Sequence, residues 1–136
     1  MLRTLEKREN GVRVGRGLKA GRRGRDLGGD SDPVRCARCR SEVTRRSAAR
    51  AVDGALVHTF ANPHGIVFRI ATYAEAPGAV GVGGEHAEFT WFAGRTWRIA
   101  LCGSCLAHLG WSFHAGAERF WGLILDRLSE PPPGSV

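Results

Sequence analysis

Between residues 55 and 128, the sequence is a series of short apolar segments separated by turn residues. The segments alternate apolar and polar positions or stay apolar over the length of a strand, which is typical of β-strands. The predicted strands span residues 55–60, 66–73, 88–92, 96–101 and 111–113. A last segment, 120–128, also fits a helical stripe, and we favour a strand that ends near Leu125.

Turn residues separate these segments at the short intervals of an antiparallel all-β domain. The glycine-rich run 78–84 is predicted to be a flexible hairpin loop, because no helix pattern follows it to complete a phosphate-binding loop. The remaining turns are Asp53-Gly54, Asn62-Pro63-His64-Gly65, Ala76-Pro77-Gly78 and Ala93-Gly94-Arg95.

The net charge of +7 is unevenly distributed along the 136 residues. Residues 1–50 hold 15 Lys and Arg against 6 Asp and Glu, a balance of +9, whereas residues 51–136 hold 5 against 7, a balance of −2. We predict a disordered basic arm over 1–31, one domain over 32–128 and a flexible tail over 129–136. The arm is either a solvated tail or a weak electrostatic hold on nucleic acid or anionic lipid.

The chain has no apolar run of membrane-spanning length, and its first residues carry no signal-peptide segment. Its four cysteines are too few for a small secreted disulfide scaffold. These observations predict a soluble, cytoplasmic protein with no membrane partner.

All four cysteines lie in two CxxC pairs, Cys36 with Cys39 and Cys102 with Cys105. Such a spacing lets two thiolates of one tight turn occupy adjacent corners of a tetrahedron, so two turns complete a four-thiolate zinc site. The predicted cofactor is one structural Zn²⁺ without an open position to activate water. Disulfides or redox chemistry are the alternative, although the βαβ setting of a redox CxxC is missing.

The four tryptophans all lie between residues 91 and 121, and three of them bracket the second CxxC pair. Trp91 and Trp97 flank a turn and can face one another across a hairpin, whereas Trp111 and Phe113 are two residues apart and project to one face of a strand. This pattern fits either a plain aromatic core or an aromatic cage.

The spaced motifs of the chain resemble the thalidomide-binding (CULT) domain of cereblon over about residues 33–128. The motifs are Phe60-Ala61-Asn62-Pro63-His64-Gly65, Trp91-Phe92-Ala93-Gly94 with Trp97, Cys102-Gly103-Ser104-Cys105, His108-Leu109-Gly110-Trp111-Ser112-Phe113 and Phe120-Trp121-Gly122-Leu123. The resemblance implies an all-β fold, the β-tent, with two antiparallel sheets that meet at a steep angle and are joined by the four-cysteine zinc site. The chain resembles the stand-alone, bacterial-type form of this domain.

The resemblance also implies a ligand pocket for a cyclic imide. Polar contacts would come from the carbonyl of Phe89 and the amide of Trp91, with Phe89 standing where eukaryotic cereblons have a histidine. Trp121 matches a position outside the cage. The ligand-binding residues that the resemblance implies are Asn62, Pro63, His64, Phe89, Trp91, Trp97, Trp111 and Phe113.

We therefore expect a small-molecule binding module rather than an enzyme. Its ligands would resemble glutarimide or thalidomide, uracil or uridine, or the cyclised end of a peptide, and no ubiquitin-ligase adaptor is expected. The alternatives are a zinc-containing nucleic-acid-binding protein that uses the basic arm, which the near-neutral body disfavours, and an interaction module with a collapsed aromatic core. A methionine sulfoxide reductase of the B type would need a further cysteine.

Overall fold

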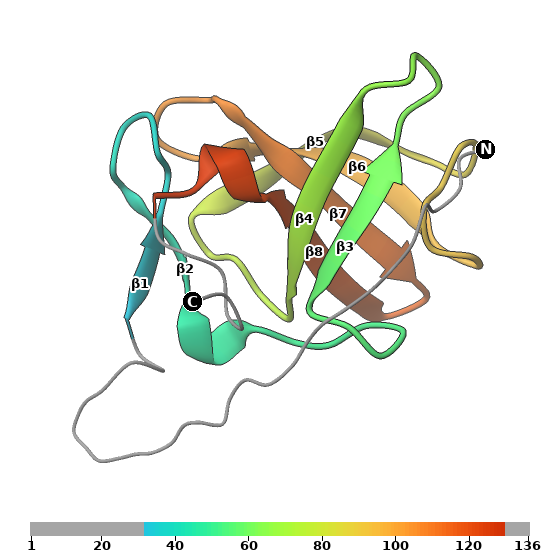
Figure 1. The fold of residues 1–136 in the computed structure, drawn as a ribbon, viewed down its shortest axis with the longest axis horizontal. Helices are drawn as coiled ribbons and strands as arrows, with labels where there is room; N and C mark the ends of the chain where they lie inside the picture. Colours follow the sequence, from blue (N-terminus) through green and yellow to red (C-terminus); the bar gives the residue numbers. More distant parts are fainter. Residues whose placement is uncertain (1–31, 130–136) are drawn as a thin grey trace.

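The computed structural model describes residues 32–129, and these residues form two antiparallel β-sheets (Figure 1). A hairpin of β1 (Pro33–Arg35) and β2 (Glu42–Arg45) forms the small sheet. Short 3-10 turns, η3 (Arg46–Ala48) and η4 (Leu125–Arg127), follow β2 and β8. The large sheet holds, in spatial order, β3 (Val57–Ala61), β4 (Val67–Tyr73), β8 (Glu118–Ile124), β7 (His108–Ala115), β6 (Thr96–Cys102) and β5 (Ala79–His86).

The all-β prediction with two antiparallel sheets is confirmed: the residues that the structure describes include no α-helix. In Figure 1, β3 and β4 run across the direction of β6 and β7, so the large sheet is strongly twisted. The strands predicted at 55–60, 66–73, 96–101 and 111–113 correspond to β3, β4, β6 and β7. The favoured strand reading of the last segment is also confirmed, because β8 ends at Ile124.

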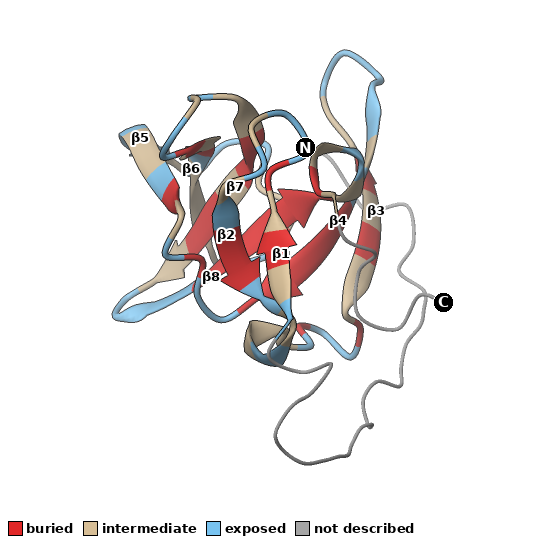
Figure 2. Ribbon diagram, turned by 90° about the vertical axis from the view of Figure 1, so that its left-hand side faces the viewer, coloured by how far each residue is buried: buried red, intermediate tan, exposed pale blue. Residues whose placement is uncertain are grey.

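The centre of the large sheet is buried on both faces, with one core on each side. Neighbouring residues of each strand project to opposite sides and therefore belong to different cores. On one face, Ala71 of β4 and Leu123 of β8 lie opposite each other and pack with Val34 and Val43 of the β1–β2 hairpin. The next pair along the two strands, Ile70 and Ile124, belongs to a separate aromatic core on the other face. Figure 2 shows this burial where β1 and β2 lie over the large sheet.

The prediction of a flexible loop over 78–84 was wrong, because residues 79–86 form the edge strand β5. Glycine is depleted in strands, but here tertiary contacts override that preference. Arg98 of β6 donates hydrogen bonds of 3.0 Å to the carbonyls of Gly81 and Gly83. A Cβ on Gly81 would lie 3.2 Å from the Arg98 guanidinium, so the missing side chain makes room for the arginine.

The prediction of a strand over 88–92 was also wrong, because residues 87–95 form an irregular loop between β5 and β6. Phe89 has a φ of 59°, which is incompatible with a strand. The apolar alternation instead reflects different surroundings, since Phe92 is buried in the aromatic core and Phe89 is exposed.

The predicted arm over 1–31 lies outside the described residues, as does the predicted tail beyond Ser129. The domain was predicted to begin at residue 32, and β1 begins at Pro33. At the other end, Leu128 forms a bridge with Cys36, and the Ser129 amide donates a hydrogen bond of 2.8 Å to the Arg35 carbonyl. Within residues 32–129, no helix has the length and the apolar character needed to span a membrane.

Candidate functional site: a four-cysteine centre and an aromatic pocket

The four cysteines converge at the tips of two hairpins that lie far apart in the sequence. Their Sγ atoms all lie within 4.8 Å of one another, and all four thiols are free. Cys36 Sγ lies 3.8 Å from Cys105 Sγ, and Cys39 Sγ lies 3.6 Å from Cys102 Sγ. Thiolates about 2.3 Å from a tetrahedral Zn²⁺ are about 3.8 Å apart, so the group fits a metal site.

The two CxxC turns have the same backbone geometry. In each turn the carbonyl of the first cysteine accepts a hydrogen bond from the residue after the second: Arg40 donates to Cys36 at 2.8 Å, and Leu106 donates to Cys102 at 2.9 Å. Both donor residues adopt a left-handed backbone, with φ of 71° and 66°. This matched pair of tight turns presents four sulfurs to one point.

Hydrogen bonds distribute negative charge unevenly among the thiols. Burial raises the pKa of Cys102, but hydrogen bonds from the Ser41 hydroxyl and from two backbone amides outweigh it and lower the pKa to about 6. At Cys105, a hydrogen bond from the Ala107 amide lowers the pKa, but burial and the neighbouring sulfurs raise it overall, to about 11. A negative charge on one sulfur therefore disfavours deprotonation of the neighbouring thiol, and a bound cation would remove this repulsion.

On the opposite face of the sheet, β6 and β7 build an apolar pocket of about 250 Å³. Trp97 lies opposite Phe113, and Ile99 lies opposite Trp111. Directly opposed residues of an antiparallel pair share one face, so all four side chains project to the same side and line the pocket.

Trp91 reaches the same pocket from the loop 87–95. Its ring meets that of Trp111 edge-on, with centroids 4.7 Å apart and planes at 73°, and stacks on Phe60 at 4.9 Å. Its Nε1 donates a 3.1 Å hydrogen bond to the carbonyl of Ala61 at the end of β3. Trp91 is therefore fixed on its ring face, its edge and its polar atom.

The turn after β3 and the residue Phe89 form the rim of the pocket. Asn62 and Pro63 line it, and Asn62 Oδ1 accepts hydrogen bonds of 2.9 Å from the amides of His64 and Ile66. His64 itself is exposed and is not among the lining residues. Phe89 lines the pocket and is 50% exposed.

The structure thus brings seven of the eight predicted ligand-binding residues to one pocket and leaves His64 outside it. Ile99 also lines the pocket and was not among the predicted residues. Ile99 could have been found from strand alternation, because it follows Trp97 by two residues on β6.

The metal site and the pocket lie on opposite faces of one sheet. Cys36 and Cys102 belong to the core beneath the β1–β2 hairpin, whereas Trp91 packs with the aromatic core on the other face. A metal at the cysteines would therefore stabilise the fold without touching a molecule in the pocket. Together, the fold and these two sites fit an all-β binding domain with a potential metal site at its four cysteines.

Comparison with known proteins agrees with this class. No family model matches the chain. The chain is similar to protein cereblon of Xenopus tropicalis, with 36% identity over 86 residues, which is 57% of this chain and 19% of that protein. Protein cereblon of Danio rerio is 36% identical over 74 residues, covering 51% of this chain and 17% of the relative. Protein cereblon of Drosophila melanogaster is 36% identical over 83 residues, which is 59% of this chain and 14% of the relative.

The chain is thus similar to protein cereblon over about half of its length, and this similarity supports the cereblon-like, thalidomide-binding (CULT) domain that the spaced motifs predicted. It spans less than a fifth of the length of these relatives.

Proposed function

We propose that this protein binds a small cyclic imide, such as glutarimide or a ring of the uracil type, in the aromatic pocket. The observation that carries the proposal is the convergence of three indoles and Phe113 on one pocket, from a loop and two strands. A pocket of about 250 Å³ is below the usual range for drug-sized ligands and suits a single small ring.

Polar recognition would come from the backbone of the loop. Among residues 32–129, neither the Phe89 carbonyl nor the Trp91 amide takes part in a hydrogen bond within the chain. A cyclic imide presents carbonyl, N–H and carbonyl along one edge, so its N–H would donate to the Phe89 carbonyl and one carbonyl would accept from the Trp91 amide. The indoles would pack against the aliphatic part of the ring.

We further infer that the four cysteines hold one structural Zn²⁺, because a tetrahedral set of four thiolates suits zinc. This closed centre would supply folding free energy and no Lewis-acid chemistry to the pocket. The proposed activity is binding rather than catalysis, the proposed partner is the small ligand, and free thiols fit a reducing location such as the cytoplasm.

A tryptophan-fluorescence titration tests the proposal, with glutarimide, uracil and uridine as ligands and N-methylglutarimide as the matched control. Saturable quenching by glutarimide that is lost with the N-methyl compound would support imide recognition through the N–H. A folded, metal-loaded protein that shows no saturation with millimolar glutarimide would overturn the proposed function.

A further inference from the structure

The loop 87–95 carries two pocket residues, Phe89 and Trp91, although it belongs to no strand. A loop without ladder hydrogen bonds needs other contacts to hold its side chains in place. Trp91 supplies one such contact through its hydrogen bond to Ala61. The end of the loop next to β6 is fixed by Arg95, which does not line the pocket.

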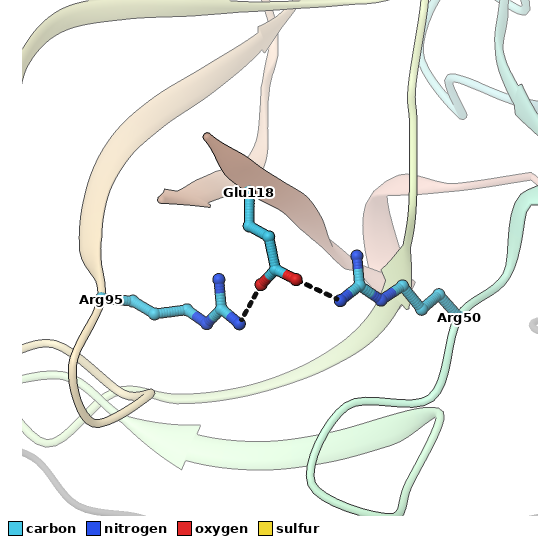
Figure 3. A network of polar contacts seen from close by, with 3 residues as sticks. All are labelled: Arg50, Arg95 and Glu118. Carbon is cyan, nitrogen blue, oxygen red and sulfur yellow. Dashed lines mark hydrogen bonds and ion pairs between the residues drawn. The ribbon is translucent and has the colours of Figure 1, made fainter. Parts of the chain in front are cut away.

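Arg95 is bound by Glu118 on one side and by Phe120 on another, and Figure 3 shows the contact with Glu118. Its Nη2 donates a 2.9 Å charge-assisted hydrogen bond to Oε1 of Glu118, at the start of β8. The guanidinium carbon lies 4.9 Å from the ring centroid of Phe120, in cation–π distance. The Arg95 amide also donates a 3.1 Å hydrogen bond to the carbonyl of Phe92, which closes the turn at the end of the loop.

The burial of the Arg95 guanidinium carries a desolvation cost in free energy. Its side chain is only 18% exposed, and its buried Nη1 has no hydrogen-bond partner among residues 32–129. An arginine without such contacts would expose this atom, so that water could accept its hydrogen bond. The Glu118 and Phe120 contacts instead draw the guanidinium below the surface.

The ring beneath Arg95 connects it to the base of the pocket. Phe120 stacks on Phe113, with centroids 5.2 Å apart and planes at 27°, and both rings meet Phe92 of the loop edge-on. Phe113 is a lining residue of the pocket. Arg95 therefore lies over an aromatic stack that ends at the binding site.

Arg50 provides an internal comparison, because it contacts the same two groups from outside the loop. Its Nη2 lies 3.8 Å from Oε2 of Glu118, and its guanidinium carbon lies 6.0 Å from the Phe120 centroid. Both of these contacts are longer than those of Arg95. Figure 3 shows the two arginines on either side of the Glu118 carboxylate. Removing Arg50 would weaken the same carboxylate network without releasing the loop.

We propose that Arg95, held by Glu118 and Phe120, is a positioning residue that fixes the loop 87–95 so that Phe89 and Trp91 are preorganised for the ligand. This inference rests on the proposed function of the pocket. It assigns a binding role to an ion pair that lies outside the pocket.

The test compares the full-length wild type with Arg95→Met, Glu118→Gln, Arg50→Gln and the double variant Arg95→Met/Glu118→Gln. Two measurements are made: the affinity for glutarimide by calorimetry, and amide hydrogen–deuterium exchange in the peptide that covers 87–95. Melting temperature and metal content are recorded for each protein. If Arg95→Met fails to fold, Glu118→Gln still tests the ion pair, because it keeps the shape of the side chain.

We expect Arg95→Met and Glu118→Gln each to weaken glutarimide binding by roughly three- to fivefold and to speed exchange in the loop. Arg50→Gln should change neither. The double variant should be no weaker than Arg95→Met alone, because the two residues act through one contact.

The positioning role is overturned if Arg95→Met leaves both affinity and loop exchange unchanged, or if Arg50→Gln causes the same loss as Arg95→Met. A wild type that binds no glutarimide would overturn the proposed function instead. The exchange measurement then decides the positioning role alone: faster exchange in Arg95→Met supports it, and unchanged exchange overturns it.

Discussion

Trp97 donates a 2.8 Å hydrogen bond from its indole Nε1 to the backbone carbonyl of Glu88, nine residues earlier in the chain. The same indole packs against His86, with ring centroids 4.6 Å apart. A single side chain on β6 is thus both a wall of the pocket and an anchor for the loop that carries Phe89. The ring and the polar atom of Trp97 therefore have separable roles.

The first prediction concerns Trp97. Trp97→Ala should weaken glutarimide binding by more than tenfold, because it removes one aromatic wall and admits water to the pocket. Trp97 is only partly buried, so the loss of unfolding free energy should be smaller than the about 3 to 5 kcal/mol of a fully buried aromatic. Calorimetric titration and thermal melting measure the two effects.

The matched control is Trp121→Phe. Trp121 is 5% exposed in the core on the opposite face, and its Nε1 is buried without a partner among the described residues. Its replacement should leave glutarimide affinity unchanged. Equal losses in the two variants would show that the fold, and not the pocket, had been damaged.

The second prediction concerns Phe89, at the rim of the pocket. Phe89→His adds a ring donor beside the position proposed for an imide carbonyl, and should tighten glutarimide binding by up to about tenfold, at roughly 0.5 to 1.5 kcal/mol per hydrogen bond. The left-handed backbone there, with φ of 59°, is a conformation in which histidine is enriched. Phe89→Leu keeps an apolar rim without a donor and should show no tightening; a gain of the same size in this variant would contradict the explanation.

The third prediction concerns the metal. The protein should contain one zinc ion per chain, and Cys102→Ser or a strong chelator should unfold most of the domain. The reason is that zinc binding in small four-ligand sites is worth about 10 to 16 kcal/mol, as much as a typical domain's whole stability. Elemental analysis and thermal melting measure both quantities.

The control for the metal prediction is Ser104→Ala. Ser104 lies inside the second CxxC turn and is exposed, and only its backbone amide contacts Cys102 Sγ. This variant should keep its zinc and its melting temperature. A metal-free wild type that melts at the same temperature as the loaded protein would refute the structural role of the metal.

The fourth prediction concerns pH. Burial lowers the pKa of His108 below its ordinary value of 6.5; a hydrogen bond with the Gly110 carbonyl acts in the opposite direction, and the charge of Arg127 lowers it further. The folded state thus favours neutral His108, so its contribution to stability is complete above pH 6.5 and is lost as the pH falls through the lower folded-state value. Stability should therefore stay level from pH 8 down to about pH 6.5 and decrease as the pH falls below that value.

His108→Gln should reduce that decrease, because glutamine stays uncharged and can donate to the same carbonyl. His64→Gln is the control, since His64 is exposed in the turn after β3 and should leave the slope as it is. Melting curves with metal content measured at each pH separate this effect from metal release. An unchanged slope in His108→Gln would assign the pH dependence to other groups.

The local pattern was informative wherever a residue's role depends on its near neighbours. Strand alternation predicted β3, β4 and β6, because each presents one face to a core at a period of two. The two CxxC pairs predicted the four-cysteine cluster, because each tight turn brings two sulfurs together and a tetrahedral metal site needs four. The spacing of the indoles left a plain aromatic core and a cage open, and it was the resemblance to the thalidomide-binding domain that implied their common pocket.

Where partners come from distant parts of the chain, only the tertiary structure decided the outcome. The glycine-rich β5 is a strand because β6 pairs with it and Arg98 caps its carbonyls, and the apolar 88–92 is a loop because its indole and backbone contacts lie on other elements. Arg95 and Glu118 are 23 residues apart, and nothing in either local sequence indicates their contact. The physical reason is that a sequence pattern reports which face of an element is apolar, whereas sheet register determines which faces and charges meet.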